Sequence, residues 1–325
     1  MVRYLSHYAC LLAGILLLGG CQSRLSSEQI APLLNTLDTR QHYIASVPFY
    51  PQQDFYCGPT TLTEVFNFYG HNYSPDDIAP KLFIPEREGS LQLEMISATR
   101  QHGLLPYAET GNLQTLLQLL RANIPVIVLQ NLSIPWFPQW HYALVTGYDI
   151  DAQTLRLHTG VTPDHVMSFA LFEKTWARGG HWLLAPLQTT SRSDGIDPFV
   201  YIGAAYDMMT AASMDEGLAF MQQATTLWPD DWRGYFFIAN AHIASEPSVA
   251  ASWFAKGFQA GKNQAAYVNN YAYVLAELGC RQSALDIITD GLAQFPDNTD
   301  LITTQQEILQ SPAASQCKVV EAVGG

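Results

Sequence analysis

The chain has 325 residues, 48% of them hydrophobic, and a formal net charge of −13 at pH 7. This length is enough for two domains. The 16 basic residues are outnumbered by 29 acidic ones, and they form no basic cluster along the sequence. The composition therefore argues against a protein that binds nucleic acid through a basic face.

The first twenty residues have the pattern of an export signal. Arg3 supplies a positive start, and residues 9–18 form an uncharged apolar run that is too short to span a bilayer. The run ends in Leu18-Gly19-Gly20-Cys21, which resembles the lipobox of bacterial lipoproteins. The resemblance implies cleavage before Cys21 and a lipid anchor on its sulfur, which would hold the protein at a membrane of the cell envelope. An ordinary secretory signal with an unmodified Cys21 is the alternative.

The residues after Cys21 indicate the membrane, inner or outer, to which the protein would be anchored. Gln22 and Ser23 follow Cys21, so the position after the anchor carries no Asp. By resemblance to enteric lipoproteins, this favours the outer membrane, facing the periplasm, over the inner membrane.

The chain contains five cysteines. Cys10 lies in the signal, and Cys21 is the predicted lipid attachment site. Cys280 and Cys317 could pair in an oxidising compartment, although the sequence alone does not fix a pairing. Cys57 would then be the unpaired thiol, and an unpaired cysteine in an exported protein calls for a chemical explanation.

Changes in composition predict the domain organisation. We expect a tether over residues 21–45, a first domain over 46–188, a linker over 189–197, a second domain over 198–311 and a flexible tail over 312–325. In the first domain, helical periodicity starts just after Cys57, and Gly70 suits the end of that helix. Helices are predicted in the first part, to residue 122, and short strands then follow, with one helix near residues 171–178. This order predicts an α+β fold.

The second domain shows an internal period. Two similar helix ends, Trp228-Pro229 and Phe295-Pro296, are separated by a turn at residues 261–263, close to midway between them. The spacing gives a period of about 34 residues, which is typical of tetratricopeptide repeats, or TPRs. Small residues recur at matching places, namely Gly217, Ala250 and Ala284, and again Ala224, Gly257 and Gly291. We therefore expect about three helical repeats and a final capping helix near 300–309; an irregular helical bundle is the alternative.

The strongest chemical motif surrounds Cys57. The thiol opens a predicted helix, followed by Gly58 and Pro59, with Gln52 and Gln53 a few residues upstream. Unpaired N–H groups and the dipole at a helix N-terminus favour the nucleophilic thiolate form. Gly58 lets a substrate backbone approach closely, and Pro59 is tolerated in the first turn. A Gln side chain can donate N–H to the oxygen that becomes negative during acyl transfer.

The second motif is a histidine at the start of an apolar strand, well beyond the thiol in the sequence. His141 follows Trp140 and precedes a β-rich run to Tyr148. In Cys/His catalysis the imidazole accepts the thiol proton and later gives it to the leaving group. A single Cys or His is more often structural. The order of Gln, Cys-Gly-Pro and Trp-His in one exported chain favours catalysis.

These motifs resemble the bacteriocin-processing cysteine peptidases, which are papain-like domains that cut double-glycine leader peptides. They resemble more closely a lipoprotein form of that family with C-terminal tetratricopeptide repeats. The resemblance implies a papain-like first domain with Cys57 as nucleophile, His141 as base and Gln52 as oxyanion donor, with Gln53 as the alternative donor. The matching residues are Gln52, Cys57, Gly58, Pro59, His141, Gly147 and Tyr148.

One position departs from the family pattern. The family has an Asp on the strand after the histidine, and here that strand reads Leu155-Arg156-Leu157-His158-Thr159. If a hairpin turns near Asp151, His141 faces residues 159–161, where there is no carboxylate. Thr159, His158 or a backbone carbonyl could orient the ring instead. Asp149 and Asp164 are weaker candidates, because Asp149 lies at the far end of the same strand, about 25 Å away.

Three functions remain open on this basis. The first is a thiol peptidase that acts on a peptide or protein, with repeats that bind the substrate or a protein partner. The second is a catalytically weak or inactive scaffold that binds peptides, and the third is a Cys/His acyl transferase. Neither a metal nor another cofactor is expected, because the sequence has no close Cys/His ligand spacing and no glycine-rich phosphate loop.

Overall fold

The computed structural model describes residues 37–83, 89–134, 136–310 and 317. The predicted export signal, Cys21, most of the predicted tether and nearly all of the predicted tail lie outside these ranges. The described residues form two compact units. The first contains the described residues up to 98, with 108–186 and 192–195, and the second contains 99–107, 187–191 and the described residues from 196 onward.

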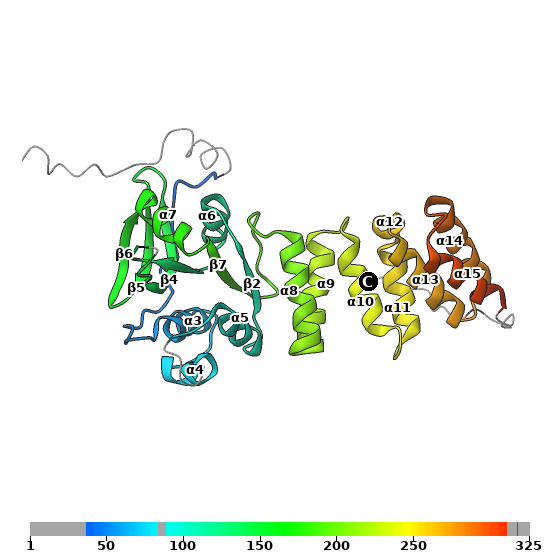
Figure 1. The fold of residues 1–325 in the computed structure, drawn as a ribbon, viewed down its shortest axis with the longest axis horizontal. Coiled ribbons are helices and arrows are strands. Elements are labelled where there is room, and N and C mark those ends of the chain that lie inside the picture. Colours follow the sequence, from blue (N-terminus) through cyan, green and yellow to red (C-terminus); the bar gives the residue numbers. More distant parts are fainter. Residues whose placement is uncertain (1–36, 84–88, 135, 311–316, 318–325) are drawn as a thin grey trace, which may run out of the picture. The chain divides into compact units, whose positions relative to one another are not determined.

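The strands in the described residues form one seven-stranded sheet (Figure 1). Its order is β2-β7-β3-β4-β5-β6, and β1 pairs separately with β4. β4 is the longest strand, and its residues 143–145 are fully buried, so it runs through the core. The strands are β1 (Gln41–Tyr43), β2 (Leu105–Thr110), β3 (Val126–Asn131), β4 (Trp140–Asp149), β5 (Thr154–Thr159), β6 (Thr162–Ser168) and β7 (Trp182–Leu187).

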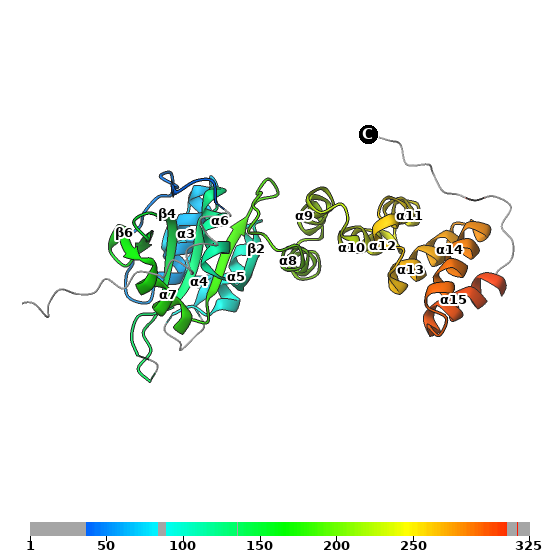
Figure 2. The ribbon, with the colours of Figure 1, turned by 90° about the horizontal axis from the view of Figure 1, so that it is seen from above.

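Helices pack against the central strands of this sheet. α3 and α6 contact β4, and α7 contacts β3 (Figure 2). α3 buries Leu62, Val65 and Phe66, which share one face at helical spacing. The helices are α3 (Cys57–Phe68), α4 (Pro75–Leu82), α5 (Gln92–Gln101), α6 (Leu113–Arg121) and α7 (Phe169–Arg178).

The predicted α+β class is confirmed, and two strands were not foreseen. β1 lies within residues 21–45, which the sequence analysis treated as a tether, and it pairs with β4 from Gln41↔Asp149 to Tyr43↔Gly147. The prediction of a tether over the whole range was therefore wrong at its end, because three residues with little apolar character gain backbone hydrogen bonds from a neighbouring strand. β2 was also missed, since Pro106 and Glu109 interrupt its apolar pattern.

The second unit is built mainly from helices. Small residues on α9, just after α11 and on α14 pack against the preceding helix: a Cβ added at Gly217, Gly257 or Gly291 would lie within 2.6 Å of Met209, Tyr235 or Val268 respectively. The all-α class is therefore confirmed, and the assignment to tetratricopeptide repeats stays a prediction. The helices are α8 (Pro198–Ala211), α9 (Met214–Leu227), α10 (Trp232–His242), α11 (Pro247–Lys256), α12 (Phe258–Gly261), α13 (Ala265–Glu277), α14 (Arg281–Gln294) and α15 (Thr299–Gln310).

The two helix ends that suggested a repeat have the same backbone geometry. Trp228 and Phe295 follow α9 and α14, with φ/ψ angles of −131°/73° and −128°/66°. Each donates its N–H to the carbonyl four residues earlier, at Ala224 and Gly291. The sequence similarity of these two ends therefore reflects equivalent positions in two helix pairs.

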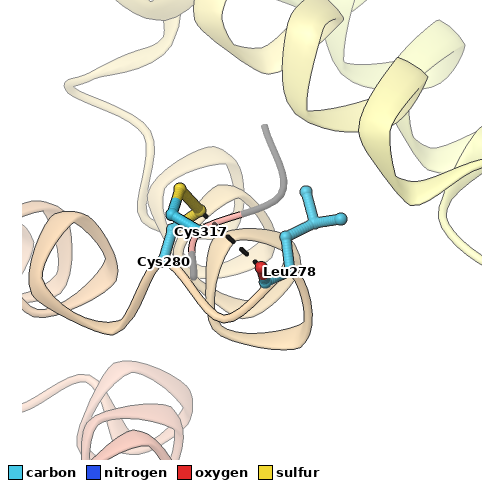
Figure 3. The surroundings of a disulfide bond; sticks show 3 residues. All are labelled: Leu278, Cys280 and Cys317. Carbon is cyan, nitrogen blue, oxygen red and sulfur yellow. Dashed lines mark hydrogen bonds between the residues drawn. A yellow bond between two sulfur atoms is a disulfide. The ribbon is translucent and has the colours of Figure 1, made fainter. Parts of the chain in front are cut away.

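A disulfide joins Cys280, at the start of α14, to Cys317 (Figure 3). Cys280 is buried, and its sulfur lies 3.9 Å from the Leu278 carbonyl oxygen in the turn between α13 and α14. Among the described cysteines Cys57 is the free thiol. The disulfide covalently ties a residue beyond the last helix back to the helical unit.

Candidate active site

Cys57 is the first residue of α3, and its thiol is half-buried. The preceding residue, Tyr56, makes no side-chain cap, so the helix start is open to another group. The next residue, Gly58, leaves no room for a larger side chain, because an added Cβ would lie 2.5 Å from Ser90 Oγ. The space beside Gly58 was expected to admit a substrate backbone. The structure instead fills it with the Ser90 side chain.

His141 lies near the start of β4, one residue into the strand. Its backbone is fixed by antiparallel pairing with Gln130 of β3. Its Nε2 atom lies 2.8 Å from the Thr159 hydroxyl oxygen, on the last residue of β5. The hydroxyl therefore holds one ring nitrogen, which leaves Nδ1 for other chemistry.

Gln52 is held from both its backbone and its side chain. Its backbone N–H donates to the Gly160 carbonyl at 2.9 Å, and its Oε1 accepts the Gly160 N–H at 3.1 Å. Its Nε2 lies 3.5 Å from the carbonyl oxygen of Tyr142, the residue after His141. Gln53 is exposed, and its backbone carbonyl accepts the Tyr56 N–H in the turn before α3. Of the two glutamines, Gln52 has the fixed side chain.

One cleft of about 810 Å³ brings these groups together. Gln52, Gln53, Cys57 and His141 all line it, with Ser90 and Gly160. Exposed apolar side chains also lie in its wall, namely Phe55, Leu91 and Trp140. No hydrogen bond joins Cys57 to His141 in this described part of the chain. Catalytic hydrogen bonds are often long before substrate binds, so this geometry is compatible with a pair that closes on a substrate.

The electrostatics of the pair differ from the sequence-based expectation. Burial raises the pKa of the Cys57 thiol, although the backbone N–H of Tyr142 opposes this shift. Burial also lowers the pKa of His141 to about 4. The expectation that the start of the helix holds Cys57 as a thiolate is therefore wrong for the resting protein. Removal from water outweighs the helix dipole, so thiol and imidazole are both neutral near pH 7.

The other candidate orienting residues lie elsewhere. Asp149 accepts the Ala152 N–H in the turn between β4 and β5. Asp164 accepts the Tyr43 hydroxyl and lies 3.8 Å from His158 Nε2. His158 is buried, and its Nδ1 lies 3.2 Å from the carboxylate of Glu64. Of Thr159, His158, Asp149 and Asp164, only Thr159 bonds to His141 in this described region.

Glu64 was not singled out from the sequence. It lies on α3 among apolar positions and is fully buried. A charged residue at a core position of an amphipathic helix is a detectable signal, because buried carboxylates need partners.

Comparison with known proteins identifies the first unit. Residues 44–181 match the model of the Peptidase_C39 like family. The match places a C39-like peptidase domain in this part of the chain. The match confirms the resemblance drawn from the Cys57 and His141 motifs, and both residues fall within the matched range.

Two solved structures are similar to the C39-like domain. One is a C39-like peptidase from Bacillus anthracis, with 14% identity and a TM-score of 0.40, covering 47% of this chain and 100% of that one. The other is the peptidase domain of Streptococcus ComA, a bi-functional ABC transporter involved in a quorum sensing pathway, with 23% identity and a TM-score of 0.36, covering 44% of this chain and 99% of that one. No curated protein matches the chain.

Two further features of the described residues complete the description. They contain no group of three or more His, Cys, Asp or Glu side chains that could hold a metal ion. None of the helices in the described ranges has the length and apolar character needed to cross a bilayer.

Proposed function

We propose that this protein is a thiol peptidase in which Cys57 attacks a peptide carbonyl and His141 transfers the proton. The observation that carries the proposal is the backbone of Tyr142. Its N–H lowers the pKa of the Cys57 thiol, its carbonyl oxygen lies 3.5 Å from Gln52 Nε2, and His141 directly precedes it. Nucleophile, base and oxyanion donor thus meet around one residue of β4. The match to the C39-like family supports the same type of activity.

The proposed reaction begins from a neutral pair. As the Cys57 sulfur bonds to the carbonyl carbon, its proton moves to His141 Nδ1, because Nε2 is engaged by Thr159. The carbonyl oxygen becomes an oxyanion that accepts N–H from Gln52 Nε2. Collapse of this intermediate breaks the C–N bond, and the imidazolium gives its proton to the leaving amine. Water, deprotonated by His141, then hydrolyses the thioester and restores the thiol.

A peptide-binding scaffold with little or no activity is the second candidate. The neutral resting state favours it, since burial raises the pKa of the Cys57 thiol and lowers that of His141. The hydroxyl of Thr159 in place of a carboxylate also favours it, because a hydroxyl stabilises an imidazolium less than a carboxylate does.

We further propose that a lipid on Cys21 anchors the protein at the outer membrane, facing the periplasm. In this proposal the helical unit acts as a set of tetratricopeptide repeats that binds a protein partner or the substrate. The Cys280–Cys317 disulfide supports an oxidising compartment, since such bonds are rare in the cytosol.

The test of peptidase activity uses the full-length protein in detergent micelles and a library of peptides of defined sequence. Mass spectrometry would identify new N-termini that form with the unmodified protein. We expect cleavage that is lost in both Cys57→Ala and His141→Ala, while Gln53→Ala retains most of it. Release of amines without new carboxyl ends would indicate acyl transfer instead. Peptide binding without any cleavage would support the scaffold.

A further inference from the structure

A buried carboxylate lies two helical turns beyond the candidate nucleophile. Glu64 follows Cys57 on α3, and its side chain is fully buried. One of its oxygens lies 3.2 Å from His158 Nδ1, and the other accepts the backbone N–H of Tyr50 at 2.9 Å. A single side chain therefore connects α3, β5 and the segment that precedes Gln52.

The segment from Phe49 to Gln52 is fixed at both ends by these contacts. At its start, the Phe49 ring packs edge-on against His158, with the ring centroids 5.2 Å apart, and Tyr50 donates to Glu64. At its end, Gln52 makes two hydrogen bonds to Gly160, two residues after His158. The strand end that carries His158 thus supports both ends of the segment, and Glu64 ties that support to the helix of Cys57.

Burial of the Glu64 carboxylate costs free energy, which argues for a role beyond filling the core. A buried carboxylate needs partners, and apolar residues of similar volume often stabilise a core as well as a buried charged pair does. Here the carboxylate accepts the backbone N–H of Tyr50. The contact fixes a main-chain position rather than only filling space.

We propose that the Glu64–His158 pair is a positioning element that sets the orientation of the Gln52 amide over the Cys57 sulfur. The proposal rests on the proposed function, in which Gln52 donates to the oxyanion. Glu64 and His158 touch no substrate; they act through Tyr50, Phe49 and Gly160 on the one side chain that does.

The kinetic test uses Glu64→Gln, which keeps the shape and an oxygen acceptor but removes the charge. We expect kcat for peptide cleavage to fall about tenfold or more, towards that of Gln52→Ala, with KM changed less than about twofold. The double variant should be no slower than Gln52→Ala, because both changes remove the same interaction. Alkylation of Cys57 by iodoacetamide should be unchanged, since that displacement forms no oxyanion.

A matched control is available one residue away. Thr63→Val also changes a buried polar side chain of α3, one whose hydroxyl donates to the Pro59 carbonyl within the helix. It should leave kcat near that of the unmodified protein. His158→Gln changes the partner of Glu64 on β5. It replaces Glu64→Gln in the kinetic test if that variant does not fold.

A second readout does not depend on activity. The side-chain amide signals of Gln52 in a ¹⁵N–¹H NMR spectrum can be assigned by their loss in Gln52→Ala. They should move in Glu64→Gln and His158→Gln, while those of exposed Gln53 stay in place. Unmoved Gln52 signals, or an unchanged kcat with active protein, would overturn the positioning role. Absence of any cleavage by the unmodified protein would instead refute the peptidase proposal, and the NMR result would still decide the positioning role.

Discussion

The Thr159 hydroxyl oxygen lies 2.8 Å from Nε2 of His141, where the last residue of β5 meets the start of β4. A hydroxyl can donate to or accept from this nitrogen, so it can orient the neutral ring and remain bonded when the ring is protonated. It carries no charge, and therefore it adds less to the stability of an imidazolium than a carboxylate does. The His141 ring is therefore oriented by an uncharged partner.

Thr159→Val tests the orientation of His141. The change keeps the side-chain shape and removes the hydrogen bond, whose net value is about 1 kcal/mol, so kcat should fall about five- to tenfold. Thr159→Ser should keep most of the activity, since the hydroxyl remains. Steady-state kinetics on a cleaved peptide measures both. Equal rates for the valine variant and the unmodified protein would mean that another group orients the ring.

The pH dependence of alkylation tests the neutral resting pair. Only the thiolate reacts, and burial raises the pKa of the Cys57 thiol, so the rate with iodoacetamide near pH 7 should be lower than that of a free thiol and should rise as pH increases. Burial lowers the pKa of His141 to about 4, so the ring is neutral across this range and supplies no positive charge to the sulfur. A fast, pH-independent rate between pH 5 and 8 would instead indicate a thiolate–imidazolium pair.

Removing the disulfide should weaken the helical unit. Cys280→Ala with Cys317→Ala opens a covalent loop with a sequence separation of 37, and the free energy of unfolding of this unit should drop by about 2–4 kcal/mol. Denaturant unfolding followed by circular dichroism measures the change. A mild reductant should lower the stability of the unmodified protein to the same level and leave the double variant unaffected. No difference between the two proteins would mean that residue 317 contributes nothing to the fold.

Two glycines offer a paired test of the helix contacts in the second unit. A Cβ at Gly217 on α9 would lie 2.4 Å from the Met209 backbone nitrogen, so Gly217→Ala should destabilise this unit by about 1–3 kcal/mol through overpacking. Gly203 on α8 has no atom within 4 Å of such a Cβ. Gly203→Ala should therefore stabilise the helix by about 0.5–1 kcal/mol. The same unfolding measurement compares both, and a stabilising Gly217→Ala would show that the two helices do not pack closely there.

The parts of the fold with a strong local signal were predictable. The helical periodicity that starts just after Cys57, carried by Leu62, Val65 and Phe66, identified α3. The proximity of His141 and Thr159 also followed from counting along the hairpin, although a β-bulge between Val145 and Gly147 shifts the register. In these cases the determining interactions are close in sequence or set by a short turn.

The features that were missed depend on distant parts of the chain. β1 exists because β4, far along the sequence, offers it backbone partners, and its own residues carry no periodic pattern. Ser90 fills the space at Gly58 from a loop that lies beyond two helices of the sequence. The neutral state of Cys57 arises from burial by surrounding elements, which a helix start alone does not reveal. No local pattern encodes these tertiary effects.

The pairing of β1 with β4 has a mechanical consequence. β1 has three residues, and it pairs with β4 at the end away from His141. A pulling force on the chain before β1 would act first on the contacts of residues 37–40, such as the Asp38–Arg121 ion pair, and then on this short ladder. β4 remains paired with β3 and β5 over longer stretches, so β1 would detach while the strand that carries the imidazole stays in place. The chain after β1 leads to Gln52, so further extension would act next on a residue that lines the cleft.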